Sequence, residues 1–388
     1  MIAINIAFLS FEYDRNLIGG AGVYAIELSR WLERSCALDV YTCIAYDSPP
    51  DAFAAAWFDK GASNVHYKRV PTPLRHHGIV AFYYYALFQG NPRGSDVFLV
   101  NDLSQGAALH SNAPIVQILH HLPSSERNHR PSGTKARMAF ALLEALENRA
   151  LGRAHMIICQ SDDTVQRLLS RYPEYATKTI VIPNGVDTQL FKPSENNHTG
   201  ATAQQSPRIL CVARGLETRK GVSHLIEAFA AVQRVERAEL VIIGTDSHGL
   251  KQQLLEQARA LGVLNAVTFR NSIPLRELIT LYQGATLTVV PSSLEGFSRP
   301  ALESMACGTP VVGSAVGALP QLIGDNSGVI VPPRDASALA DALTSLLQDR
   351  KRTLSMGVAA RQRALTRFSW DAIAPKVVDV CRQVASGQ

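Results

Sequence analysis

Short apolar runs rich in Val, Ile and Leu alternate with stretches of helical periodicity along the chain. Continuous apolar runs are typical of strands that are buried on both faces of a parallel sheet. In the first half, strands are predicted at residues 2–10, 38–43, 65–70, 96–100, 114–120, 155–159 and 179–183. In the second half, they are predicted at residues 208–213, 239–244, 266–269, 286–291, 309–314 and 328–332. Because helices separate the strands in both halves, the pattern predicts an α/β fold.

A change of composition near residue 194 separates the two series of strands. The segment SENNHTGATAQQS (194–206) is polar, small and without periodicity, as expected of a loop or linker. We therefore expect two Rossmann-like, doubly wound domains with parallel sheets, over residues 1–190 and from residue 191 onward. Ligands of such sheets bind beyond the carboxyl ends of the strands, so two domains facing each other would form one cleft.

Composition excludes several classes of protein. The 388 residues suffice for two or three domains, and 46% hydrophobic with 18% charged residues is ordinary for a protein with real cores. A net charge of +5 suits an anionic ligand but is too weak to indicate nucleic acid binding. A surface with a slight excess of Lys and Arg explains it equally well.

The cysteines and the apolar segments give no sign of secretion or of membrane insertion. The cysteines form no CxxC pairs and lie mostly in apolar runs, which indicates buried thiols in a reducing compartment rather than disulfides or a zinc site. They are Cys36, Cys43, Cys159, Cys211, Cys307 and Cys381. The start MIAINIAFLSFEYD lacks a basic region and a cleavage site, so we interpret it as a strand, not a signal peptide. No stretch is long enough to span a membrane as a helix. We expect a cytoplasmic protein, with contact at the inner membrane face as an alternative.

The segment TLTVVPSSLEGFSRPALESMACGTPVVGS (286–314) predicts strand, loop, helix, turn and strand. Pro300 suits the first helical turn, and Gly308 suits the helix exit. Glu295 then lies in the loop at the mouth of the sheet, and Glu303 lies in the helix. The start of the helix also offers backbone N–H groups that can bind an anion. Two such acids could hold the two ends of a sugar nucleotide. Taken alone, a pair of solvated acids is the simpler interpretation.

Two basic residues follow the first strand of the second half. Arg214 and Lys220 lie in RILCVARGLETRKG (208–221), which leads into an amphipathic helix. An arginine fork and a lysine point charge at the end of a strand suit a diphosphate. Ordinary surface basicity is an equal alternative for these two residues alone.

The first domain has two weaker signals. Gly19, Gly20 and Gly22 follow the first strand and precede a helix, but GGAG is not a dinucleotide fingerprint. They would let a ligand approach the backbone, or form a plain tight turn. His120 and His121 end a strand, where one of them could face a substrate, because adjacent strand residues point to opposite faces. A structural role for both is the alternative.

No cluster of His, Asp or Glu has the spacing of metal ligands, and no DxD motif is present. Asp162 and Asp163 lie at a probable helix start, where capping explains them. The aromatic segment HHGIVAFYYYALF (76–88) favours a helix buried in the first domain, with an acceptor-side or membrane-surface patch as the alternative.

Together these motifs resemble the retaining glycosyltransferases of family 4, which have the GT-B fold. The resemblance rests on GGAG, on His120, and on four further segments that follow in the same order. They are VIPNGVDTQLFKP (181–193), VARGLETRKG (212–221), PSSLEGFSRPALESMACGTPVVGS (291–314) and FSW (368–370). As an ordered set, they are far more specific than any one of them.

The resemblance implies the roles of the site residues. Arg214 and Lys220 would bind the donor diphosphate, Glu303 the ribose hydroxyls, and Glu295 the donor sugar. The remaining implied donor-site residues are the backbone amides of Gly296, Phe297 and Ser298, together with Leu302, Gly19 and Gly20. His120 would contact the transferred sugar. The donor domain would span residues 191–366, and residues 367–388 would form a helix that crosses back to the first domain.

The implied reaction moves a hexose-type sugar from a UDP- or GDP-sugar to a hydroxyl of a cell-envelope glycan, a glycolipid or a small metabolite. It would keep the anomeric configuration and need no metal or other cofactor. This chain departs from the family pattern at Ser298, Arg299 and His121, which leaves the sugar and the acceptor open. A sugar-nucleotide 2-epimerase, a phosphorylase, a non-catalytic nucleotide-binding subunit and a membrane-docking protein are the alternatives.

Overall fold

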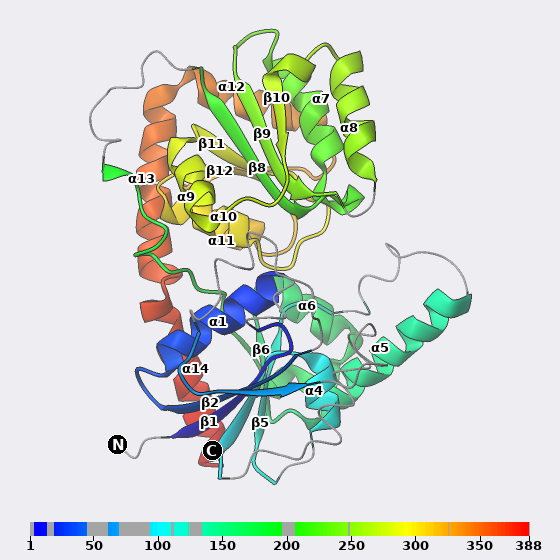
Figure 1. Ribbon diagram of the computed structural model, residues 1–388, viewed down its shortest axis with the longest axis vertical. Helices are drawn as coiled ribbons and strands as arrows, with labels where there is room; N and C mark the ends of the chain where they lie inside the picture. Colours follow the sequence, from blue (N-terminus) through cyan, green and yellow to red (C-terminus); the bar gives the residue numbers. More distant parts are fainter. Residues whose placement is uncertain are drawn as a thin grey trace. The chain divides into compact units, whose positions relative to one another are not determined.

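The computed structural model describes residues 4–13, 19–44, 61–69, 94–109, 112–122, 124, 134–195, 206–246, 249–324 and 326–387. The chain divides into two compact units. Unit 1 comprises Met1–Gly185 and Trp370–Gln388, and unit 2 comprises Val186–Ser369. Each unit is built on one parallel sheet with helices packed against it (Figure 1). The predicted α/β fold with two parallel sheets is therefore confirmed, and every predicted strand is present within a few residues of its expected bounds.

The sheet of unit 1 has the strand order β3-β2-β1-β4-β5-β6-β7, and every pair is parallel. Its strands are β1 (Asn5–Leu9), β2 (Ala37–Ile44), β3 (Val65–Arg69), β4 (Val97–Val100), β5 (Ile115–Leu119), β6 (Met156–Cys159) and β7 (Thr179–Val181). All residues of β4 and β5 are buried, as the continuous apolar runs predict. The order reverses between β1 and β4, which marks the ligand edge of a doubly wound sheet.

The helices of unit 1 are α1 (Gly20–Leu32), α4 (Leu103–Ala108), α5 (Thr134–Arg153), α6 (Asp162–Arg171), the 3₁₀ segment η4 (Pro173–Lys178) and α14 (Trp370–Ala385). Helix α6 begins at Asp162 as predicted, but its capping side chain is Ser161, which accepts from the Thr164 N–H. The C-terminal helix α14 packs against α1, β4 and β5. The fully buried Trp370 fixes this contact, because its indole N–H donates to the Glu27 carboxylate at 3.0 Å.

The sheet of unit 2 has the order β10-β9-β8-β11-β12-β13, again with every pair parallel. Its strands are β8 (Arg208–Gly215), β9 (Glu239–Thr245), β10 (Val267–Arg270), β11 (Leu287–Val290), β12 (Val311–Ser314) and β13 (Gly328–Val331). The order reverses between β8 and β11. These two strands lie side by side although β9 and β10 follow β8 in the chain.

The helices of unit 2 are α7 (Val222–Val232), α8 (Leu250–Ala260), α9 (Leu275–Gly284), α10 (Arg299–Ala306), α11 (Leu319–Ile323), α12 (Ala336–Gln348) and α13 (Arg350–Arg367), with 3₁₀ segments η6 (Thr218–Lys220) and η7 (Leu264–Ala266). Apolar side chains of α7, α8 and α12 form one buried cluster with β8 and β9. Helix α10 packs against α13 and contacts α9 and α11. Pro300 lies in the first turn of α10, as predicted.

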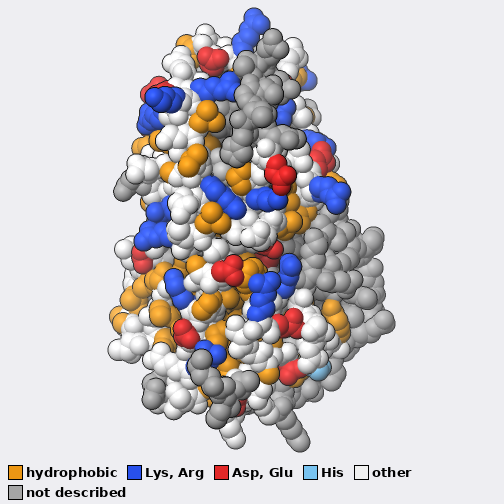
Figure 2. Space-filling model, turned by 90° about the vertical axis from the view of Figure 1, so that its left-hand side faces the viewer, with side chains coloured by type: hydrophobic (Ala, Val, Ile, Leu, Met, Phe, Trp, Pro, Cys, Tyr) orange, Lys and Arg blue, Asp and Glu red, His pale blue; other side chains and the backbone are white. Residues whose placement is uncertain are grey.

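Several sequence predictions concern surfaces and thiols. The five described cysteines are buried and unpaired, and burial raises the pKa of the Cys36 thiol to about 11 and that of Cys159 to about 12. In the part of the chain described, no helix combines the length and the apolar character that crossing a membrane requires. On the face shown in Figure 2, basic side chains are interspersed with acidic and hydrophobic ones rather than gathered in one patch. The aromatic segment 76–88 lies outside the described residues.

Candidate active site

The loops that follow β8 and β11 carry two of the predicted site residues. Lys220 ends η6 after β8, and Glu295 lies in the loop between β11 and α10. Because β8 and β11 are adjacent at the reversal of strand order, their loops meet at the same edge of the sheet. The topology thereby brings together residues that are 75 positions apart in the chain.

Close backbone contact holds these two loops together. Gly221 has a φ of 68°, and a Cβ at this position would lie 2.0 Å from the carbonyl oxygen of Pro291. Only glycine allows both this conformation and this approach. The backbone N–H of Ser293 donates to the carbonyl oxygen of Arg219 at 2.8 Å. As a result, η6 is fixed against the start of the Glu295 loop.

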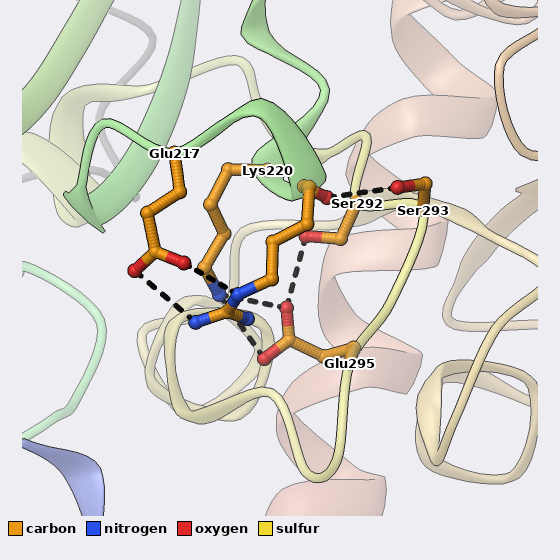
Figure 3. Close-up of polar contacts among 6 residues, drawn as sticks. Glu217, Lys220, Ser292, Ser293 and Glu295 are labelled. Atoms are coloured by element: carbon orange, nitrogen blue, oxygen red, sulfur yellow. Dashed lines mark hydrogen bonds and ion pairs between the residues drawn. The ribbon is translucent and has the colours of Figure 1, made fainter. Parts of the chain in front are cut away.

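Lys220 and Glu295 form a direct ion pair (Figure 3). The ammonium nitrogen lies 2.9 Å from Oε2 and 3.2 Å from Oε1 of Glu295. The Ser292 hydroxyl also donates to Oε2 at 2.9 Å. The side chains are only 18% and 10% exposed, so water screens this pair less than it screens a surface pair.

A second pair on the same segment was not expected from the sequence. The Arg219 guanidinium donates from Nε to Glu217 at 2.6 Å and from Nη2 at 3.3 Å (Figure 3 labels Glu217). Both side chains are about one-third exposed, at 32% and 34%. The only sequence signal was the mixture of one acid and two bases in ETRK, which is common on any surface. The edge that carries Lys220 thus holds a second cation, Arg219, which directly precedes Lys220 in η6.

The loop from Glu295 to Ser298 presents polar groups at the start of α10. Its backbone is anchored where the Ala318 N–H donates to the Gly296 carbonyl oxygen at 3.0 Å. Gly317, with a φ of 55°, permits this contact, since a Cβ there would lie 2.0 Å from the Glu295 carbonyl oxygen. The Ser298 side chain sits at the N-cap and is buried, yet its hydroxyl has no hydrogen-bond partner within the described residues. A buried hydroxyl without a partner at a helix start suits an anionic ligand.

Glu303 lies one turn into α10 and is buried with two donors. Nη2 of Arg299 donates to its Oε1 at 3.1 Å, and the hydroxyl of Tyr282 donates to its Oε2 at 3.1 Å. Burial, and then the neighbouring Glu303 charge, raise the pKa of Tyr282 well above its ordinary value, so the phenol keeps its proton. The sequence marked Arg299 as a departure from the family pattern but did not reveal this contact.

The remaining donor-site residues of the second half have different surroundings. Leu302 is 1% exposed, so its side chain packs in the core, and its predicted role in donor binding stays a prediction. The ring of Phe297 packs edge-on against Phe368, at 6.4 Å between centroids. Arg214 lies in β8, but its side chain is outside what the structure describes. Its predicted contact with a diphosphate stays a prediction.

His120 follows β5 in unit 1 and lies in a polar network. Its Nε2 donates to the Asn101 side-chain oxygen at 2.7 Å, and its Nδ1 accepts from the Gln160 amide at 2.7 Å. This pattern assigns a neutral ring with its proton on Nε2. Tyr24 packs edge-on against the ring at 5.0 Å. Sequence reasoning missed Asn101 and Gln160, because single polar residues at strand ends give no pattern.

The glycine loop of unit 1 contacts a carboxylate of the same chain. Gly19 is the N-cap of α1, and Glu12 accepts from the N–H groups of Gly19 at 2.7 Å and of Gly22 at 3.3 Å. Gly19 therefore precedes α1 as its N-cap, whereas Gly20 and Gly22 lie in the first turn of the helix rather than before it as predicted, and Glu12 already takes one of the expected anion-binding amides. His121 is exposed.

Among the described residues, no group of three or more His, Cys, Asp or Glu side chains could hold a metal ion. The charges at the β8–β11 edge are instead Lys, Arg and Glu. An arrangement of this kind can stabilise a phosphate-bearing group through ammonium, amide and hydroxyl donors.

Comparison with known proteins identifies the family. The family described as Glycosyl transferases group 1 matches residues 194–363, and Glycosyltransferase Family 4 matches residues 18–190. The chain belongs to glycosyltransferase family 4. The resemblance to this family is thereby confirmed, and the two parallel-sheet units are those of the GT-B fold.

Similar proteins share part of the sequence or the fold of this chain. The MMP alpha-(1->4)-mannosyltransferase of Mycolicibacterium hassiacum is 30% identical over 69% of this chain, and the match spans 64% of that protein. Among solved structures, sucrose-phosphate synthase from Thermosynechococcus elongatus aligns with a TM-score of 0.79 and 24% identity, over 99% of this chain and 100% of that one. Anabaena HepE in complex with UDP-glucose aligns with a TM-score of 0.75 and 21% identity, over 98% of this chain and 100% of HepE. At these identities, the structures show a shared fold.

Proposed function

We propose that this family 4 protein transfers a hexose-type sugar from a nucleoside diphosphate donor, a UDP- or GDP-sugar, to an acceptor hydroxyl. The anomeric configuration is kept and no metal takes part. The bond from the anomeric carbon to the diphosphate breaks with its electron pair going to the phosphate oxygen. The acceptor oxygen then bonds to that carbon on the same face, and the proton of the acceptor hydroxyl passes to the departing phosphate oxygen.

The observation that carries the proposal is the group of donors at the β8–β11 edge. Lys220 is held within 2.9 Å of Glu295, and the buried Ser298 hydroxyl has no partner in the described part of the chain. These groups lie at the reversal of strand order, where doubly wound sheets bind ligands. A diphosphate placed there would receive an ammonium ion and the N-terminus of α10, which stabilise its developing charge without a metal.

The two acids would bind different parts of the donor. Glu303 is buried within α10 and would accept from the ribose hydroxyls. Glu295 lies at the loop, beside Lys220, and would accept from hydroxyls of the transferred sugar. HepE, which shares the fold, was solved with UDP-glucose bound, which supports a UDP-sugar as the first donor to test.

The acceptor would be a cell-envelope glycan, a glycolipid or a small metabolite. The M. hassiacum relative is named as a mannosyltransferase. His120, whose ring is oriented by Asn101 and Gln160, would contact the transferred sugar, and a sugar hydroxyl would then replace one of these partners.

A ligand screen tests the proposal. UDP-, GDP- and ADP-sugars are added separately, and the thermal unfolding midpoint is measured for the wild type and for Lys220→Ala. A ligand at 100 times its Kd adds about 2.7 kcal/mol of stability, so one nucleotide class is expected to raise the midpoint in the wild type only. Nuclear magnetic resonance of the product then reports the anomeric configuration. No stabilisation by any nucleotide sugar, or an inverted product, would reject the proposal. A new free nucleotide sugar formed without acceptor would indicate an epimerase instead.

A further inference from the structure

Arg299 occupies an unfavourable position unless it acts on Glu303. It is the first residue of α10, where the helix dipole disfavours a cation. Its side chain is only 8% exposed, and that of Glu303 is 7% exposed. In a buried ion pair, both charged groups lose their hydration, and this cost can cancel the attraction between them. The pair is therefore weak evidence that Arg299 only stabilises the fold. The helix dipole and the burial of charge would therefore favour a neutral residue at this position.

The two contacts of Glu303 use only part of the hydrogen-bond acceptor capacity of its carboxylate. A carboxylate offers about four acceptor positions, two on each oxygen. Arg299 takes one on Oε1, and Tyr282 takes one on Oε2. The carboxylate is thereby fixed from two sides, by its own helix and by α9. In the part of the chain that the structure describes, no other side chain donates to it, so one acceptor position stays available on each oxygen. Two available positions on adjacent oxygens match the two hydroxyl donors of a vicinal diol.

We propose that Arg299 and Tyr282 are positioning residues that orient Glu303 for the vicinal diol of the donor's ribose, and so select ribonucleotides. Neither residue touches the reacting atoms. The proposal rests on the proposed function, because it requires a nucleotide whose ribose meets Glu303. Arg299 fixes one oxygen and supplies the opposite charge, whereas Tyr282 fixes the other oxygen without any charge.

The test compares UDP with 2′-deoxy-UDP by isothermal titration calorimetry. The wild type is expected to bind UDP at least tenfold more tightly than 2′-deoxy-UDP, because the deoxy compound leaves one acceptor of Glu303 unpaired. In Arg299→Leu and in Tyr282→Phe, the UDP affinity is expected to fall about tenfold while the deoxy affinity falls less, so that the preference shrinks. Arg299→Lys keeps the charge and is expected to recover part of the preference.

A matched control separates this effect from general loss of an ion pair. Asp163 and Arg167 form another pair four residues apart on a helix, in unit 1. Arg167→Leu is expected to leave both affinities unchanged. With a donor in hand, Arg299→Leu is also expected to raise KM with little change in kcat, since ribose binding is the same in ground and transition states.

The outcomes distinguish the inference from the proposed function. A wild type that binds none of UDP, GDP and ADP overturns the proposed function, and the inference with it. A wild type that binds UDP without preference over 2′-deoxy-UDP overturns only the inference. If the folded variants Arg299→Leu and Tyr282→Phe keep the full preference for UDP over 2′-deoxy-UDP, the inference is likewise overturned. If Arg299→Leu does not fold, Tyr282→Phe, which removes one hydroxyl, decides alone.

Discussion

The ammonium group of Lys220 lies 2.9 Å from the Glu295 carboxylate, although the two residues are 75 positions apart. Each was expected to bind a different part of a sugar nucleotide. In the structure, each neutralises the other, with Ser292 as a third partner. Binding of a diphosphate to Lys220 would therefore release Glu295 for the hydroxyls of the sugar.

Replacing Lys220 by Ala is expected to lower kcat by about 10²–10³, since one donor to the leaving group is lost. The fold should survive, because Lys220 ends the 3₁₀ segment η6, which is held by backbone contacts at Gly221 and Ser293. Steady-state kinetics with the donor identified by the screen measure the effect. Arg208→Ala, which breaks the exposed pair with Glu239 at the other end of β8, is the control. Near-normal turnover of Lys220→Ala would contradict the assignment.

Replacing Glu295 by Ala is expected to reduce sugar transfer more than it reduces binding of the nucleotide. The reason is that Glu295 would accept from the sugar, whereas its absence leaves Lys220 available to the diphosphate. Calorimetry with UDP and UDP-glucose, alongside kcat, separates the two effects. A larger loss of UDP affinity than of turnover would instead give Glu295 the nucleotide role.

Activity is expected to persist in excess EDTA. The charge on the leaving group would be met by Lys220, by backbone amides and by the Ser298 hydroxyl rather than by a divalent ion. The measurement is the initial rate after dialysis against EDTA, with and without added Mg²⁺ or Mn²⁺. A loss of rate that only a metal restores would show that the mechanism needs one.

Replacing Trp370 by Phe is expected to lower the free energy of unfolding by about 1.5–3 kcal/mol, because a buried hydrogen bond to the Glu27 carboxylate is lost. Urea denaturation followed by circular dichroism measures the change. Trp31→Phe is the control, since Trp31 is partly exposed on the same helix as Glu27 and stacks on Arg34. Equal effects of the two substitutions would show that the hydrogen bond contributes nothing measurable.

The stability of the protein is expected to fall as pH rises from about 4 to 7 through the contribution of Asp102. Burial raises the pKa of this carboxyl to about 7 in the folded state, from an ordinary value of 3.8. The folded state thus holds the proton over this window while the unfolded state has released it, so the unfolding free energy decreases with pH.

Asp102→Asn removes this titration while its side-chain oxygen can still accept from the Phe11 N–H. We expect it to increase stability at pH 7.5 by roughly 1–3 kcal/mol and to have little effect at pH 4. Urea titrations of the two proteins at both pH values give the comparison. Parallel stability–pH curves would show that Asp102 titrates normally.

The sequence predicted the fold well because buried parallel strands are continuous apolar runs, which short-range pattern alone reveals. It also placed Glu295 in a loop and Glu303 in a helix correctly. It could not show that Arg299 contacts Glu303, since a pair four residues apart on a helix is usually solvated. Nor did it reveal Glu12 at the glycine loop, because a single acid seven residues before Gly19 carries no signal.

Chain order alone determined the alternating strands and helices, the polar break near residue 194 and the membership of a glycosyltransferase family. Local steric and hydrophobic rules govern those features. Only the tertiary structure decided which charges meet. Lys220 reaches Glu295 because β8 lies beside β11, and that adjacency follows from strand order within the sheet, not from distance along the chain. Electrostatic partners depend on position in space, which no linear spacing records.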